Sequence, residues 1–184
     1  NSYLNHRTEG GNELVFLNLQ GARLGLLDLE RFKRQIEYCL LPNGTCTDMV
    51  LQVQGRYPDT LPFDFMAPMG IWFENFALPV VINECLLQSY NGVIRLFPNW
   101  DLQRRAEFHT LRAVGAFLVS AACENGAVQW VEITSEVGGT LRLIVPWAEG
   151  AQVRRGGKEF VVSSGLVEME TTPGEKMQFS RNQP

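Results

Sequence analysis

The stretch "MGIWFENFALPVVINECLLQSYNGVIRLFPNW", residues 69–100, marks the place where the chain changes character. Its middle part, residues 76–90, is apolar on nearly every face, which predicts a buried helix. Pro79 fits the first turn of this helix, and the pair Asn91-Gly92 fits its end. After the pair, apolar residues recur in short runs of strand type. The stretch therefore predicts that helices precede it and strands follow it.

Size and composition set the broad class of the protein. The 184 residues are 45% hydrophobic and 20% charged, as in an ordinary globular domain. The net charge of −4 disfavours nucleic acid and anionic membranes as partners. No apolar run reaches the roughly 18 residues of a transmembrane helix. With two His and no CxxC pair, neither a metal site nor a cofactor is expected.

Two further helices are expected upstream. Residues 12–26 are apolar on nearly every face, with Asn12 as a helix N-cap and Gly25 as a stop, and this predicts a helix buried all round. Residues 27–42 place their apolar side chains on one stripe, and Asp28 is expected to cap the start. A buried helix followed by an amphipathic one is typical of the inner and outer helices of a two-layered helical barrel.

The second half of the chain predicts an antiparallel β-sandwich over residues 93–184, after a helical segment over 1–92, so that the fold class is α+β. Asn125-Gly126 is a strong hairpin signal, and other Gly pairs separate the remaining runs. The expected strands are "VIRLF", "GAFLVSAAC", "AVQWVEITSE", "TLRLIVPW", "EFVVSS" and "LVEMETT".

The four cysteines divide into two groups. Cys85 and Cys123 lie in apolar runs and are expected to be small core residues. Cys39 and Cys46 flank the turn "LPNGT", and a disulfide between them stays open.

Glu74 is the residue that most needs an explanation, because a carboxylate among Trp72, Phe73 and Phe76 is costly unless something uses it. The expected helix start places Glu74 just ahead of a helix N-terminus, where the ionised form is favoured. Two interpretations stay open at this point. Glu74 is either a carboxylate with a functional role or an acidic helix cap.

A second polar cluster lies in "LNHRTEGGNE", residues 4–13, directly ahead of the first buried helix. His6 and Arg7 are candidates to donate to sugar hydroxyls, Glu9 is a candidate second carboxylate, and Asn12 belongs to the same cluster. A solvated loop with a helix cap is the competing interpretation. His109 is expected to be an ordinary sheet residue.

Three segments carry a family resemblance. They are "GARLGLLDLERFKRQIEYCL", "ENFALPVVINECLLQSYNGVIRLFPNW" and "LRAVGAFLVSAACENGAVQWVEITSEVGGTLRLIVPW". In this order they resemble the C-terminal third of glycoside hydrolase family 95, over roughly residues 10–147. The family contains inverting α-L-fucosidases and related α-L-galactosidases. The resemblance implies that the terminal helices of an (α/α)6 barrel precede the antiparallel β-sandwich.

The resemblance also implies roles near Glu74. An "IDGNF"-type motif supplies the family's catalytic Asp, and alignment on Asn75-Phe76 places Phe73 at the Asp and Glu74 at the Gly. Glu74 then either replaces the base from the neighbouring position, or catalysis is lost. Asn75 is expected to hold the water or a sugar hydroxyl, while Trp72 and Phe76 offer flat faces to a sugar ring.

The predicted function is the C-terminal portion of an inverting, α-L-fucosidase-like glycoside hydrolase acting on oligosaccharides or glycans. The alternative is a non-catalytic carbohydrate-binding or structural module derived from such an enzyme. A chain that begins at Asn1 is expected to be either a processed chain or a piece of a longer one. As a piece it is expected to be inactive alone, because the general acid lies upstream. The expected partners are a carbohydrate and either the rest of the parent enzyme or a second chain packed on the helices. The resemblance favours a periplasmic or secreted location.

Overall fold

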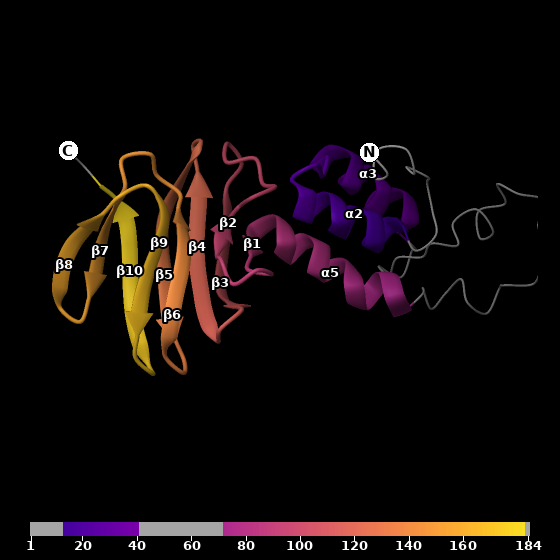
Figure 1. Cartoon of the computed structure of the whole chain (residues 1–184). Helices are drawn as coiled ribbons and strands as arrows, with labels where there is room; N and C mark the ends of the chain where they lie inside the picture. Colours follow the sequence, from indigo (N-terminus) through magenta and orange to yellow (C-terminus); the bar gives the residue numbers. More distant parts are fainter. Residues whose placement is uncertain (1–12, 41–71, 183–184) are drawn as a thin grey trace, which may run out of the picture. The chain divides into compact units, whose positions relative to one another are not determined.

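The computed structural model describes residues 13–40 and 72–182 (Figure 1). The chain divides into two compact units, Asn1–Glu84 and Cys85–Pro184, here called the helical unit and the strand unit. The expected boundary at residues 92/93 lies a short way beyond this division. The predicted α+β class is confirmed, because the described part contains helices followed by mostly antiparallel strands.

Helix α2 spans Glu13–Leu24, close to the predicted range. It ends as predicted at Gly25, whose φ of 67° is a conformation that glycine adopts without strain. The amide of Leu26 donates to the carbonyl of Gly21 at 2.8 Å, and the amide of Gly25 donates to Ala22 at 3.2 Å. These two bonds form a Schellman motif, which satisfies carbonyl groups at the helix end.

The prediction that α2 is buried all round is wrong. Val15 is 2% exposed and packs with Phe32 and Val81 in a small core, but Phe16 is 49% exposed and Leu24 is 63% exposed. The three core residues come from one side of each helix, so the helical unit covers only part of its apolar surface.

Helix α3 spans Leu29–Cys39 and confirms the second predicted helix. The carboxylate of Asp28 accepts a hydrogen bond from the amide of Arg31 at 2.9 Å, so the predicted N-cap is also confirmed. Leu40, expected on the apolar stripe, is 47% exposed.

Helix α5, Trp72–Leu86, begins and ends earlier than the predicted helix over 76–90. Pro79 lies inside the helix, where its missing N–H removes one helical hydrogen bond. Residues Leu87–Gln88 leave the helix to form β1, which pairs with β2, Arg95–Leu96. The amide of Phe97 donates to the Leu86 carbonyl at 2.7 Å. Tertiary pairing therefore overrides the helical pattern of the apolar run.

The strand unit contains a six-stranded antiparallel sheet in the order β3-β4-β5-β10-β7-β8 (Figure 1). Its strands are β3 (Ala106–Ala113), β4 (Phe117–Glu124), β5 (Ala127–Ser135), β10 (Glu175–Arg181), β7 (Ala151–Arg155) and β8 (Lys158–Val162). The strands β7 and β10 were not among the predicted strands, and β3 was expected only through His109, which was predicted to be a sheet residue. The last strand in the sequence, β10, lies in the middle of the sheet.

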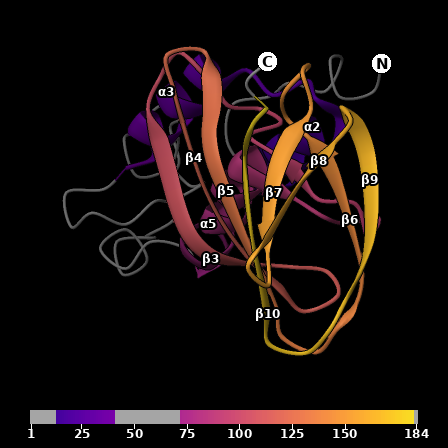
Figure 2. The ribbon, with the colours of Figure 1, turned by 90° about the vertical axis from the view of Figure 1, so that its left-hand side faces the viewer.

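A two-stranded sheet pairs β6, Gly139–Val145, with β9, Gly165–Thr171. Figure 2 shows β6 and β9 set apart from β3, β4 and β5. Both sheets contribute to one hydrophobic core, in which Leu143 of β6 and Val131 of β5 are fully buried. Trp147 is also buried in this core, and its indole N–H donates to the carbonyl of Val128 at 2.8 Å.

The glycine-based turns are where the sequence predicts them. Asn125 and Gly126 have φ values of 53° and 81° and join β4 to β5. Both residues have positive φ, as a type I′ hairpin turn requires. Gly156 and Gly157 do the same between β7 and β8, with φ values of 53° and 76°. The hairpin prediction at Asn125-Gly126 is confirmed.

A β-bulge interrupts β5. Ala122 pairs with Trp130, but the next residue, Cys123, pairs with Val128, which leaves Gln129 as the extra residue. In a regular strand Val128 and Trp130, two residues apart, would face the same side. The extra residue shifts the alternation, so Val128 is buried while Trp130 points outward. None of the helices that the structure describes has the length and apolar character needed to span a bilayer.

Candidate functional site

The predicted sugar-binding residues of the N-terminal loop, His6, Arg7, Glu9 and Asn12, lie outside the described residues. The same holds for Cys46, so the open question of a disulfide with Cys39 is not resolved by the described part.

The other four predicted site residues lie in α5. Trp72, Glu74, Asn75 and Phe76 belong to its first five residues, and the description covers their backbone but not their side chains. Glu74 was expected just ahead of the helix; instead it is the third residue inside it. The first turn still favours an ionised carboxylate, because unpaired backbone N–H groups give this end a partial positive charge.

Glu84, the second acid of the stretch over residues 69–100, has a structural partner. Its carboxylate lies 2.9 Å from the guanidinium of Arg23, which joins α5 to α2. The Glu84 side chain is 13% exposed and that of Arg23 is 45% exposed. A partly buried carboxylate paired in this way holds two helices together. Glu84 therefore has a structural role and is a suitable control for Glu74 on the same helix.

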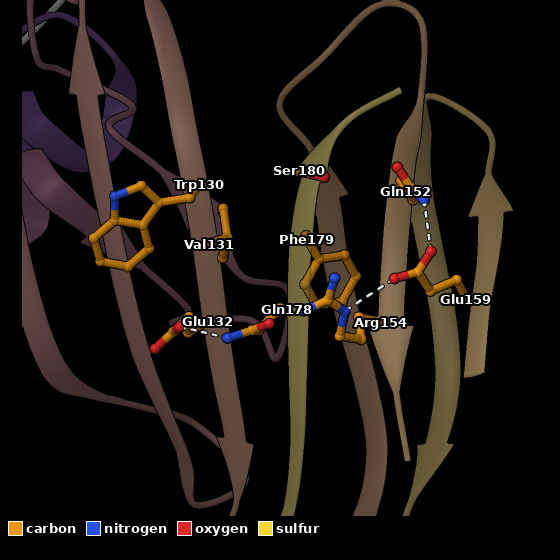
Figure 3. Close-up of a pocket in the computed structure, with 9 residues that line it drawn as sticks. All are labelled: Trp130, Val131, Glu132, Gln152, Arg154, Glu159, Gln178, Phe179 and Ser180. Atoms are coloured by element: carbon orange, nitrogen blue, oxygen red, sulfur yellow. Dashed lines mark hydrogen bonds and ion pairs between the residues drawn. The ribbon is translucent and has the colours of Figure 1, made fainter. Parts of the chain in front are cut away.

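The strand unit has a hollow that the sequence did not predict. It lies on the polar face of the six-stranded sheet, over β5, β10, β7 and β8, and has a volume of about 420 Å³ (Figure 3). A neighbouring hollow of about 250 Å³ shares Glu132, Arg154 and Gln178 with it. Ligand pockets typically have volumes of about 300–1,000 Å³, so the larger hollow is of ligand size.

Strand register aligns polar side chains across the hollow. Gln178 on β10 pairs with Glu132 on one side and with Arg154 on the other, and Arg154 pairs with Glu159 on β8. The Gln178 amide donates to the Glu132 carboxylate at 2.8 Å, and the Arg154 Nε donates to Glu159 at 3.0 Å. Gln152 donates to the second Glu159 oxygen at 3.1 Å. Figure 3 shows both sets of bonds on this face.

An aromatic side chain lies beside this row. Figure 3 shows the indole of Trp130 on the side of the hollow away from Arg154 and Glu159. The imidazole of His109 lies against the indole, with ring centroids 5.9 Å apart and an interplanar angle of 34°. His109 also lies 3.0 Å from the carboxylate of Glu107. It was expected to be an ordinary sheet residue, and the structure places it next to the hollow's aromatic wall.

A strained backbone accompanies His109. Thr110, the next residue, has a φ of 55°, a conformation that β-branched residues rarely adopt, at an irregularity in the pairing of β3 with β4. The amide of Thr110 donates to the hydroxyl of Ser120 at 3.0 Å, which holds the irregular backbone in place. Such strain typically costs about 1–3 kcal/mol and clusters at functional sites.

Neither a metal nor a reactive thiol is indicated in the part of the chain that the structure describes. Among residues 13–40 and 72–182, no group of His, Cys, Asp and Glu is arranged to hold a metal ion. Cys85 and Cys123 are buried, as predicted for small core residues. Burial raises the pKa of the Cys123 thiol, which keeps it in the unreactive protonated form.

Comparison with models of known protein families gave no match, and comparison with curated proteins gave none either.

Proposed function

We propose that this chain is the C-terminal portion of an inverting, α-L-fucosidase-like glycoside hydrolase, with Glu74 as the general base. The observation that supports this most is the position of Glu74 in the first turn of α5, in a chain whose helices are followed by mostly antiparallel strands. The resemblance to glycoside hydrolase family 95 supplies the reaction class. In this proposal the helices end an (α/α)6 barrel and the strands form its β-sandwich.

An inverting glycosidase requires an acid and a base on opposite faces of the scissile bond, with their carboxyl groups roughly 6.5–9.5 Å apart. Glu74 would deprotonate the attacking water, and a segment outside this chain would supply the general acid. Asn75, Trp72 and Phe76 would contact the sugar, together with His6, Arg7, Glu9 and Asn12 from the N-terminal loop.

Exposed apolar side chains support a partner for the helical unit. Leu24 is 63% exposed and Leu26 is 47% exposed, and Val80 and Ile82 on α5 are each 42% exposed. Groups of exposed apolar residues typically mark interaction surfaces. In this proposal the remainder of the parent enzyme, or a second chain, covers them.

Turnover by the intact parent enzyme tests the role of Glu74. Glu74→Gln should lower kcat by about a hundredfold or more, because the variant cannot accept the proton of the attacking water. The matched control is Glu84→Gln, the same change on the same helix, which should keep kcat because Glu84 is paired with Arg23. Near-normal turnover by Glu74→Gln would remove Glu74 from the mechanism.

The second candidate is a non-catalytic carbohydrate-binding module. Phe73 favours it, since it occupies the position of the family's catalytic Asp, and the polar hollow of the strand unit favours it too. Binding of fucosides or galactosides by the full-length protein without hydrolysis would support this second candidate against the first.

A further inference from the structure

We infer that the polar face of the six-stranded sheet is a binding site for a neutral oligosaccharide. The site consists of the indole of Trp130 and the row Glu132, Gln178, Arg154 and Glu159, here called the sheet groove. It lies entirely in the strand unit, so it does not depend on the role of Glu74.

The dimensions of the sheet groove suit a short chain of sugars. The groove crosses four adjacent strands, β5, β10, β7 and β8, which spans about 14 Å at the usual strand spacing of about 4.8 Å. The smaller hollow shares Glu132, Gln178 and Arg154 with the larger one and continues along the strands to the turn at Gly156 and Gly157. A short linear ligand can therefore lie either across the strands or along them.

The charged side chains of the groove carry no net charge, which favours neutral ligands over ionic ones. The carboxylates of Glu132 and Glu159 are balanced by the cations of Arg154 and Lys176, which line the same two hollows. Four charges that sum to zero neither attract an anion such as a phosphate nor attract a cation strongly. A neutral ligand rich in hydroxyl groups needs no net charge to bind and finds many polar partners in the groove.

The hydrogen-bonding groups of the row alternate in a way that suits sugar hydroxyls. A hydroxyl group both donates and accepts, and the row offers acceptors at its two carboxylates and donors at Arg154, with Gln178 able to do both. In the described part of the chain, Arg154 donates through Nε to Glu159 at 3.0 Å and makes no hydrogen bond through its two terminal nitrogens. The bond to Glu159 uses only Nε, so both terminal nitrogens are available to donate to a ligand.

Trp130 supplies an apolar surface next to the polar row. Trp130 is partly exposed, although its neighbours in the row on this face of the sheet are polar. A flat aromatic ring can cover the C–H face of a pyranose while hydroxyl groups at the ring edge reach the polar row. The imidazole of His109 lies beside the indole, with ring centroids 5.9 Å apart, and extends this aromatic surface.

The test is a titration of the full chain with neutral oligosaccharides of glucose, galactose, xylose, mannose and fucose, followed by NMR of backbone and side-chain amides. We expect millimolar or tighter binding of at least one of them, with shifts of the Trp130 indole N–H and the Gln178 amide. Trp130→Ala and Arg154→Ala should each weaken binding about tenfold or more.

Arg142→Ala is the matched control. Arg142 on β6 forms a cross-strand ion pair with Glu168 at 2.6 Å, as Arg154 does with Glu159 on the six-stranded sheet. Arg154 is 65% exposed and Arg142 is 41% exposed, so neither change should alter the unfolding midpoint appreciably. The control variant should bind as the unmodified chain does.

Three results would overturn the inference: no binding of any neutral oligosaccharide at millimolar concentration, equal loss in the Arg142→Ala control, or stronger binding of chondroitin sulfate used as an anionic probe. None of these results bears on turnover by Glu74→Gln in the parent enzyme, so the two proposals fail separately.

Discussion

The helical unit and the strand unit differ in how completely each covers its own apolar surface. In the described part of the chain, the core of the strand unit contains twenty buried hydrophobic side chains, and that of the helical unit contains three. Within residues 13–40 and 72–84 of the helical unit, apolar side chains such as Leu24, Val80 and Ile82 stay exposed. The described residues therefore indicate a closed core in the strand unit, and we propose that a partner covers the exposed side chains of the helical unit.

This difference separates the two proposed sites. Chemistry at Glu74 requires helices that have their partner in place, together with a general acid from elsewhere. The sheet groove requires only the register of β5, β10, β7 and β8, which the closed core of the strand unit fixes. Binding in the groove should therefore be measurable in this chain, whereas turnover should require the parent enzyme.

The largest expected effect is on the core of the strand unit. Phe179 on β10 is 1% exposed, and Phe179→Ala should lower the free energy of unfolding by about 3–5 kcal/mol because it leaves a cavity. Phe160 on the edge strand β8 is 38% exposed, and Phe160→Ala should cost about 1 kcal/mol or less. Urea unfolding followed by circular dichroism gives both values. Equal losses would mean that the core of the strand unit is not closed.

The next largest expected effect is on self-association through the exposed apolar side chains of the helical unit. The chain should self-associate, and replacing Leu24 and Leu26 together by Ser should raise its dissociation constant about tenfold or more, since each apolar side chain contributes about 1.5–3 kcal/mol when buried. Val137→Ser is the control, because Val137 is 65% exposed in the strand unit. Sedimentation velocity over a range of concentrations measures the effect. A dilute monomer unaffected by either change would contradict the need for a cover.

Loss of the α3 cap should have a smaller effect, confined to the helical unit. Asp28→Ala removes the acceptor for the Arg31 amide and should destabilise the helix by about 1 kcal/mol. Amide exchange in α3 should quicken while exchange in the six-stranded sheet stays the same. Faster amide exchange in both units would show that they unfold together, and would contradict a difference in stability between them.

The smallest expected effect is on the stability of the strand unit at acid pH. The hydrogen bond from Arg155, at 2.7 Å, with a further bond from the Thr172 amide, lowers the pKa of Glu175 below its ordinary value of 4.5. The ionised carboxylate therefore adds stability above pH 4.5, and this contribution is lost as the pH falls through the lowered pKa. Glu175→Gln should flatten the fall in melting temperature below pH 4.5. Parallel curves for the two proteins would contradict this assignment.

Local signals in the sequence predicted the helices and turns well. Asp28 and Gly25 delimit helices by hydrogen bonds within a few residues, and Asn125-Gly126 adopts the φ values that a hairpin turn needs. These features depend on neighbouring residues alone. The start of α5 was missed because Pro79 lies inside the helix and not in its first turn.

Features that depend on distant residues were not predicted. Leu87–Gln88 continue an apolar helical pattern but form β1, because Arg95–Leu96 pair with them. The sheet groove could not be derived from the sequence, since Gln178 meets Glu132 across 46 residues of chain through the insertion of β10 between β5 and β7. The only local signal was the alternation of Trp130 and Glu132 on one face of a strand, which indicates exposure but not what lies beside it.

Hydrogen exchange of the full chain, read by mass spectrometry, tests the central comparison most directly. Amides of β4, β5 and β10 should exchange slowest, at the free energy of global unfolding, because both sides of each strand are paired and the core beneath them is closed. Amides of α2 and α3 should exchange much faster in the same sample. Equal protection of the helices and the central strands would show that the helical unit needs no cover, and would contradict the account.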